Sequence, residues 1–108
     1  MNITEKRFIE CIKNWNFIIK KVGEDRTITL NNYWATGNIL AMFFDYKQGN
    51  KKGYIKIYLD KNRYSKPLKV DVYLLREKHD ILLKTFSDIQ EFKLFLENLE
   101  TEIKEVLE

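Results

Sequence analysis

The sequence predicts an α+β fold: a helix near each end, and between them an antiparallel sheet of about four to six strands. Two observations favour it. Apolar residues recur at helical spacing near both ends, and strict alternation of apolar and polar residues marks the segments in the middle. A third observation, the length of 108 residues, fits a single domain over residues 1–108.

The first predicted helix follows Thr4, whose hydroxyl can accept a hydrogen bond from a free amide of the first turn. An apolar face then runs along it, made of Phe8, Ile9, Cys11, Ile12 and Trp15. Cys11 lies on this face, so we interpret it as a small core residue and not as a reactive nucleophile, which would need exposure and a basic neighbourhood.

The next segments are rich in β-forming residues. Residues 16–22 and 26–30 predict a hairpin, because a Gly-Glu-Asp turn signal separates them. Residues 31–37 read as an irregular stretch that ends at a glycine. Up to Asp45, residues 38–46 carry apolar side chains at both odd and even positions, which predicts a central, well-buried strand. Residues 47–53 are polar and contain two glycines, which predicts a loop.

Residues 54–60 and 68–75 alternate between apolar and polar side chains, as strands with one buried face do. The apolar set is Ile55, Ile57, Leu59, Leu68, Val70, Val72 and Leu74. The opposite set is Tyr54, Lys56, Tyr58, Lys69, Asp71 and Tyr73. Residues 76–80 resemble a turn, and residues 81–86 form either a last short strand or the approach to the final helix.

The final helix is predicted to be long and to pack on one face of the sheet. Ser87 and Gln90 have the spacing of a capping box. An apolar stripe follows, made of Ile89, Phe92, Leu96, Leu99, Ile103 and Val106, and Leu94, Phe95 and Leu107 widen it. A wide stripe favours packing on a sheet. The regular steps of three and four leave a homodimer through a helical seam as the alternative.

The net charge is +3, but the charges are unevenly distributed. Residues 46–79 hold ten basic and three acidic side chains, whereas residues 80–108 hold three basic and eight acidic ones. Such asymmetry indicates an interaction surface. The alternative is that the two segments face each other in the folded chain and cancel.

No catalytic or metal-binding signature is present. One histidine, His79, cannot form the clusters that zinc sites use, and a lone cysteine excludes an internal disulfide. Gly49 and Gly53 have the wrong spacing for a phosphate-binding loop. We therefore expect a protein that is not an enzyme and has no cofactor. With no long apolar run and charges near its start, the chain is expected in the cytoplasm, away from membranes.

The polar side of the alternating strands is the surface that suggests a function. Its predicted partner-binding residues are Lys51, Lys52, Tyr54, Lys56, Tyr58, Arg63, Lys69 and Tyr73. Tyrosine rings could stack on unpaired bases while these lysines, with Lys47 and Lys66, contact phosphates. The same surface could instead bind a protein, since tyrosine is enriched at interfaces. It could also be only a solvated sheet face, because Tyr–Lys pairs stabilise strands.

In size, composition and lack of catalytic motifs, the chain is similar to small accessory proteins of phages and mobile elements, such as anti-CRISPR-type inhibitors. This likeness rests on no motif and assigns no residue a role. It implies a non-enzymatic protein that acts by binding a host protein or ribonucleoprotein. A single-stranded nucleic-acid-binding module that uses the Tyr/Lys face is the alternative function.

Overall fold

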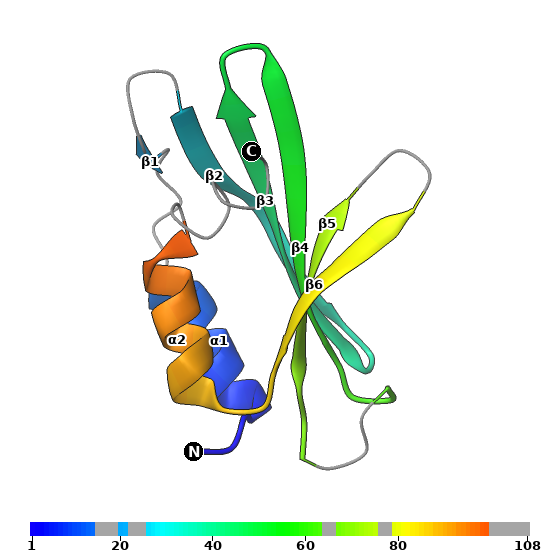
Figure 1. Ribbon diagram of the computed structural model, residues 1–108. Helices are drawn as coiled ribbons and strands as arrows, with labels where there is room; N and C mark the ends of the chain where they lie inside the picture. Colours follow the sequence, from blue (N-terminus) through cyan, green and yellow to red (C-terminus); the bar gives the residue numbers. More distant parts are fainter. Residues whose placement is uncertain (15–19, 22–25, 64–66, 76–78, 100–108) are drawn as a thin grey trace.

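The structure is a computed structural model that describes residues 1–14, 20–21, 26–63, 67–75 and 79–99. Within these residues, six antiparallel strands form one sheet in which every strand pairs with the strand before it. The strands are β1 (Lys20–Lys21), β2 (Arg26–Thr36), β3 (Ile39–Gln48), β4 (Lys51–Asp60), β5 (Val70–Leu75) and β6 (Asp80–Phe86). Two helices, α1 (Glu5–Asn14) and α2 (Ile89–Glu97), lie side by side on one side of the sheet (Figure 1). The predicted α+β class with an antiparallel sheet is confirmed.

Side-chain caps set the starts of both helices. The hydroxyl of Thr4 accepts a hydrogen bond of 3.2 Å from the Arg7 amide, as predicted. The prediction of Ser87 as the second cap is wrong, because Asp88 holds that position. Its carboxylate accepts hydrogen bonds from the amides of Gln90 and Glu91 at 2.9 and 3.1 Å. Aspartate caps as well as serine does, and its charge also suits the positive end of the helix dipole.

The described part of α2 is nine residues long and ends at the cap residue Asn98. Four residues of the predicted stripe are buried in the chain's own core: Ile89, Phe92, Leu96 and Leu99. Leu94, which was expected to widen this stripe, is instead 59% exposed, because it points away from the sheet side of the helix. Ile103, Val106 and Leu107 lie outside the described residues, and so does the rest of the predicted long helix.

The prediction of an irregular stretch over residues 31–37 is wrong, since β2 continues to Thr36. The register of β2 against β3 shifts between Leu30 and Asn32, so one residue is inserted into the strand. An insertion of this kind is a β-bulge, and it reverses the order in which later side chains alternate between the faces. The reversal hides the strand pattern in the sequence, although tyrosine, tryptophan and threonine favour strands.

The predicted loop over residues 47–53 is also wrong. Gln48 pairs with Lys51, so β3 and β4 run up to a two-residue turn. Gly49 in that turn has a φ of 57°, and Gly37 in the β2–β3 turn has a φ of 55°. Positive φ in a two-residue turn matches the twist of the hairpin strands, and glycine adopts it without strain. The ambiguous segment before α2 is a strand, β6.

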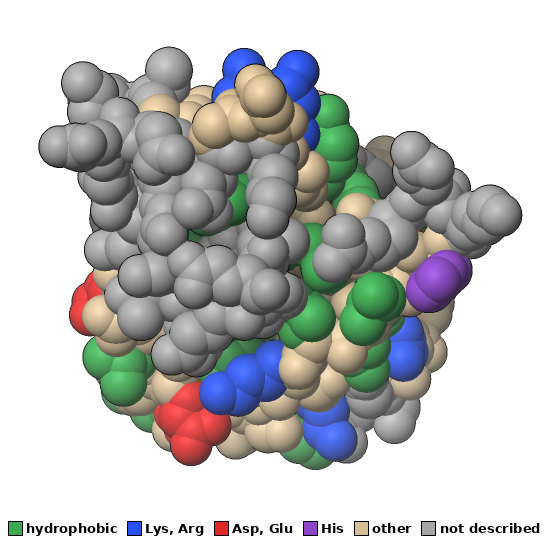
Figure 2. Space-filling view, turned by 45° about the horizontal axis from the view of Figure 1, so that its top comes forward, with side chains coloured by type: hydrophobic (Ala, Val, Ile, Leu, Met, Phe, Trp, Pro, Cys, Tyr) green, Lys and Arg blue, Asp and Glu red, His purple; other side chains and the backbone are tan. Residues whose placement is uncertain are grey.

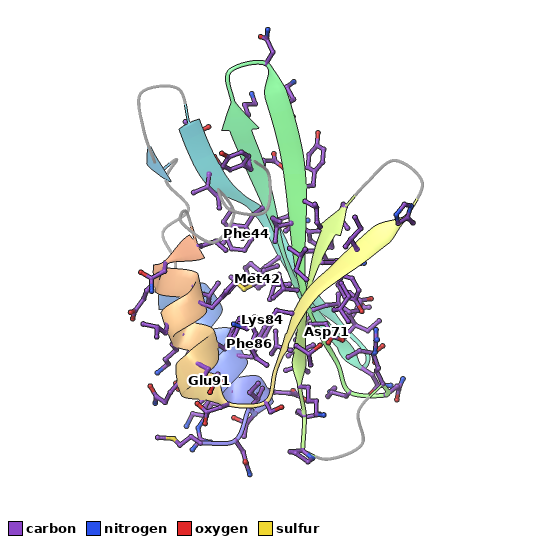
Figure 3. All side chains as sticks on the ribbon, in the orientation of Figure 1. Met42, Phe44, Asp71, Lys84, Phe86 and Glu91 are labelled. Carbon is purple, nitrogen blue, oxygen red and sulfur yellow. The ribbon has the colours of Figure 1, made fainter. Side chains whose placement is uncertain are left out.

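The core lies between the sheet and the two helices. Met42, Phe44 and Phe86 point from the sheet towards the helices, whereas Asp71 lies on the opposite side of the sheet (Figure 3). The rings of Phe8 on α1 and Phe92 on α2 stack with their centroids 5.7 Å apart. The ring centroid of Phe86 lies 5.6 Å from that of Phe92. This aromatic cluster therefore joins both helices to the edge of the sheet.

Several expected features fall wholly or partly outside the described residues. The apolar face of α1 is confirmed at Phe8 and Cys11, which are buried, whereas Trp15 is not described. Of the first predicted hairpin, only the pairing of residues 20–21 with 27–28 is described, and most of the predicted turn over residues 76–80 is not. No helix in the described parts of the chain is both long enough and apolar enough to span a membrane.

Candidate binding face

The sheet surface opposite the helices, called the open face below, is organised in rows that cross the strands. The register places Lys47 beside Lys52 in the first row. The second row is Asp45, Tyr54, Leu75 and Asp80. The third row is Phe43, Lys56, Tyr73 and Leu82. The fourth row is Ala41, Tyr58, Asp71 and Thr85. Most of the predicted site residues therefore lie on one surface.

Lys56 is held inside the open face by neighbouring side chains. Its ammonium nitrogen lies 4.8 Å from the ring centroid of Tyr58 and 5.0 Å from that of Tyr73. The same nitrogen is 3.1 Å from a carboxylate oxygen of Asp80 on β6. Both cation–π contacts and the ion pair engage this charge within the protein. Lys56 therefore holds the rings of Tyr58 and Tyr73 in place, and its charge is already engaged within the protein.

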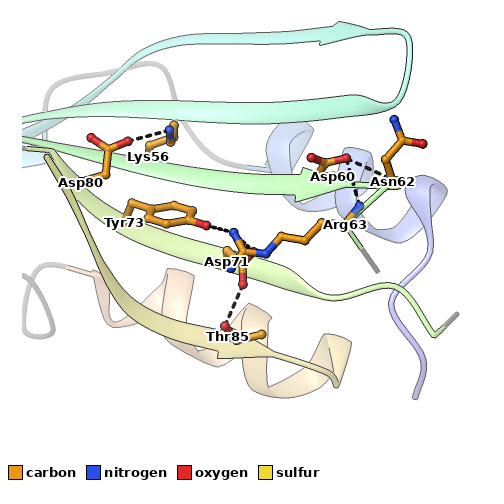
Figure 4. A network of polar contacts seen from close by, with 8 residues as sticks. All are labelled: Lys56, Asp60, Asn62, Arg63, Asp71, Tyr73, Asp80 and Thr85. Carbon is orange, nitrogen blue, oxygen red and sulfur yellow. Dashed lines mark hydrogen bonds and ion pairs between the residues drawn. The ribbon is translucent and has the colours of Figure 1, made fainter. Parts of the chain in front are cut away.

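Asp71 carries a carboxylate that is almost completely buried although it belongs to the open face. The residue is 1% exposed. The Thr85 hydroxyl donates a 2.7 Å hydrogen bond to one of its oxygens, and the Arg63 guanidinium lies 3.6 Å from the other (Figure 4). Arg63 also donates a hydrogen bond to the Tyr73 hydroxyl. A buried carboxylate needs such partners to offset its lost hydration. Asp71 therefore lies on the predicted side of the sheet, but these partners bury it there.

The turn after β4 positions Arg63 for these contacts. The Asp60 carboxylate accepts hydrogen bonds from the backbone amides of Asn62 at 2.9 Å and Arg63 at 3.4 Å. This local pattern is an Asx-type turn, which fixes the direction of the following residues. The guanidinium of Arg63 then reaches from the turn over β5 (Figure 4). Sequence alone does not indicate this, since it depends on the conformation of the turn.

The structure brings six of the eight predicted site residues onto one surface. Tyr54, Lys56, Tyr58 and Tyr73 are neighbours on the open face, and Arg63 reaches them from the turn. Lys52 lies at the hairpin end of the same face, opposite Lys47. Lys69 precedes β5 and is half-buried. The side chain of Lys51 is not among those described.

Acidic side chains that were not predicted to matter nearly balance the charge of this face. The described basic residues on or beside it are Lys47, Lys52, Lys56, Arg63 and Lys69. The described acidic ones are Asp45, Asp60, Asp71 and Asp80. Register brings these aspartates from four different strands onto one surface. Among the described residues of this face, the basic side chains therefore outnumber the acidic ones by only one.

Charged side chains are scattered over the side of the molecule that Figure 2 shows. On the side that Figure 2 shows, lysine and arginine side chains lie in separate groups, with hydrophobic and other side chains between them. A continuous basic stripe is the arrangement typical of nucleic-acid-binding surfaces. None is visible among the described residues in this view.

Apolar side chains reach solvent on the same face. Tyr54 is 49% exposed and Leu82 is 45% exposed, and Leu75 lies beside Tyr54 in the second row. The sequence analysis did not include Leu75 or Leu82 in the site. Leu75 ends a predicted strand, and Leu82 lies in the segment predicted as either a strand or the approach to the final helix. The bulge between β5 and β6 also obscured which face Leu82 occupies.

No metal or nucleophile site is found in the described parts of the chain. They contain no group of three or more histidine, cysteine, aspartate or glutamate side chains placed to hold a metal ion. Burial raises the pKa of the Cys11 thiol, which disfavours the reactive thiolate. A hollow of about 520 Å³ beside residues 2–5 and 67–68 is lined mainly by apolar atoms. Its one charged residue, Glu5, forms an ion pair with Lys61 at 2.5 Å.

Comparisons with known proteins assign no family to the chain: no protein-family model matches it, and neither a curated protein nor a solved structure does.

Proposed function

We propose that this chain is a non-enzymatic binding protein whose open face docks a host protein or ribonucleoprotein. Small accessory proteins of phages and mobile elements, such as anti-CRISPR-type inhibitors, act in this way, and the chain has their size and composition. The observation that carries the proposal is the exposure of Tyr54 and Leu82 on a face whose central charges are paired internally.

The chemistry of this face suits a protein partner. Protein interfaces combine an apolar centre containing tyrosine with a polar rim. Tyr54, Leu75 and Leu82 provide the apolar centre, and Tyr73 lies beside them in the rows. The pair Lys56–Asp80 crosses this patch and presents a polar pair already satisfied within the protein. A partner would therefore cover an apolar surface without stripping an unpaired charge of water.

A single-stranded nucleic-acid-binding module is the second candidate function. Its support is the grouping of Tyr54, Tyr58 and Tyr73 on one face, since rings in such a group can stack bases. Two of those rings, however, already contact the Lys56 ammonium, which a stacked base would have to displace. The balance of acidic and basic groups also weakens attraction to phosphates.

Affinity capture with matched variants tests the proposed function. Tyr54→Ala/Leu82→Ala removes the apolar patch, and Tyr33→Ala/Leu94→Ala removes the same residue types elsewhere, at exposures of 46% and 59%. A partner captured from nuclease-treated host extract by the wild type and the control, and lost with the patch variant, supports the proposal. Equal capture by all three proteins would contradict it.

Titration of labelled oligonucleotides separates the two candidates. Twelve-nucleotide single-stranded DNA and RNA and duplex DNA are followed by fluorescence anisotropy at low and near-physiological salt. The proposed function predicts that the wild type shows no salt-dependent binding to these oligonucleotides of the kind that Tyr54→Ala would remove. Tight binding that prefers single strands and weakens steeply with salt would instead support the nucleic-acid module.

A further inference from the structure

Lys47 and Lys52 form an unusual pair at the hairpin end of the open face. They are directly opposite each other across β3 and β4. Like charges at opposed positions of an antiparallel ladder destabilise it. Both side chains are exposed, and no hydrogen bond or ion pair joins either ammonium group to a described residue. The other basic groups at the centre of the face, Lys56 and Arg63, have acidic partners.

The surroundings of this lysine pair connect it to the apolar patch. Lys52 and Tyr54 are two residues apart on β4, so their side chains emerge on the same face. Tyr54 is in turn opposite Leu75 on β5. The open face thus offers two unpaired positive charges at one end and an exposed apolar surface immediately beside them.

From this arrangement we infer that the open face recognises an acidic, partly apolar segment of a protein partner. Carboxylates of that segment bind the ammonium groups of Lys47 and Lys52, and its apolar side chains pack on Tyr54, Leu75 and Leu82. The inference rests on the proposed function and adds the chemical class of the partner. Repulsion between the two lysines destabilises the free protein. A carboxylate between them would relieve this repulsion, and that favours complex formation.

The same observations favour an acidic protein segment over a nucleic acid. Two neighbouring charges suffice for one or two carboxylates. Binding along a nucleic-acid strand needs cations spaced along a groove for several nucleotides. Beyond Lys52 the open face instead presents the Lys56–Asp80 pair and a second carboxylate, that of Asp45.

Selection from a displayed library of random twelve-residue peptides tests this inference. Three proteins are compared: the wild type, Lys47→Gln/Lys52→Gln, and the control Lys6→Gln/Lys13→Gln. The control makes the same change in net charge at two exposed positions of α1. Recovered peptides are then titrated alongside counterparts in which asparagine and glutamine replace aspartate and glutamate, and alongside single-stranded dT12.

The inference expects the wild type and the control to select peptides with aspartate or glutamate beside apolar residues. It expects Lys47→Gln/Lys52→Gln and the neutral peptides to weaken binding by about tenfold or more, since each charged hydrogen bond is strong. Peptides without acidic enrichment, or binding insensitive to the lysine variant, would overturn it. Failure to select any peptide would overturn it too.

The outcomes also separate this inference from the proposed function. If Tyr54→Ala/Leu82→Ala abolishes peptide binding while Lys47→Gln/Lys52→Gln does not, the face binds proteins but not through acidic recognition. If dT12 binds the wild type and no peptide does, both the inference and the proposed function fail.

Discussion

The Arg63 guanidinium lies 3.6 Å from the carboxylate of Asp71, a residue that is buried beneath the surface of the open face. The contact joins the turn after β4 to the start of β5, and Thr85 extends it to β6. A polar network of this kind fixes the relative positions of the rings and charges around it. The shape of the candidate binding face therefore depends on a carboxylate that a partner would not contact.

Replacing Asp71 by alanine should destabilise the protein more than replacing either of its exposed partners, Arg63 or Thr85. The change leaves the Thr85 hydroxyl and the Arg63 guanidinium without their acceptor, and we expect the free energy of unfolding to fall by about 2 kcal/mol. Asp71→Asn should lower the free energy of unfolding by less, because asparagine keeps the shape of the side chain. Urea denaturation measures both. An unchanged midpoint for Asp71→Ala would mean that the network contributes nothing to stability.

The aromatic cluster between the helices and β6 should be the most sensitive part of the core. Phe92 contacts Phe8 and Phe86, so Phe92→Ala should lower the free energy of unfolding by about 3–5 kcal/mol through lost burial and a cavity. Leu94→Ala on the exposed side of the same helix is the control, expected to change stability by less than about 0.5 kcal/mol. Similar effects of the two changes in thermal or urea denaturation would contradict the packing described for α2.

Stability should depend on pH through Asp88. The hydrogen bond from the Met1 ammonium group, and then that from the Glu91 amide, lower the pKa of this carboxyl. Because the folded-state pKa is depressed, the carboxylate contributes stability above its unfolded pKa of about 4, and this is lost as pH falls through the folded pKa. Wild type and Asp88→Asn should thus differ in stability at pH 6, and the difference should shrink as pH falls through the folded-state pKa of Asp88. A difference that stays constant over this range would contradict the assignment.

The thiol of Cys11 should react slowly in the folded protein. Its burial blocks access and raises its pKa, so the reactive thiolate is scarce at pH 8. Labelling with a disulfide reagent should be fast in urea and slow in buffer, whereas Asn50→Cys at the exposed β3–β4 turn should label quickly in both. Rapid labelling of Cys11 in the native wild type would show that this side of α1 is not packed against the core.

Lys52→Glu should stabilise the free protein while abolishing recognition of an acidic partner. The change replaces a like-charge pair with an opposite-charge pair across from Lys47, a gain of about 0.2–1 kcal/mol. Urea denaturation should show the higher stability at low salt, and the gain should shrink as salt increases. Lower stability at low salt would mean that the two ammonium groups do not repel each other in the free protein.

Much of the fold could be predicted from local patterns. Alternation along β4 and β5 identified which side chains enter the core, and the helical spacing of Phe8 and Cys11 identified the buried side of α1. The extent of β2 could not be predicted, because a bulge interrupts its alternation. The second cap was misplaced by one residue because Ser87 and Asp88 are both good capping residues.

The candidate site was predicted less completely than the fold, since it depends on contacts between distant segments. Alternation placed Tyr54, Lys56, Tyr58 and Tyr73 on one side of the sheet, and the structure agrees. It could not reveal that Asp80, from another hairpin, pairs with Lys56, or that Arg63 reaches over Asp71. Those contacts change the interpretation of the face from a basic platform to a nearly neutral one.

The most direct test of the account is the affinity of a purified captured partner for three proteins: the wild type, Tyr54→Ala/Leu82→Ala, and the matched control Tyr33→Ala/Leu94→Ala. The account predicts that the patch variant binds at least about tenfold more weakly while the control binds as the wild type does. All three must unfold at similar urea concentrations for the comparison to apply. Equal affinities for the patch variant and the wild type would contradict the claim that the open face is the binding surface.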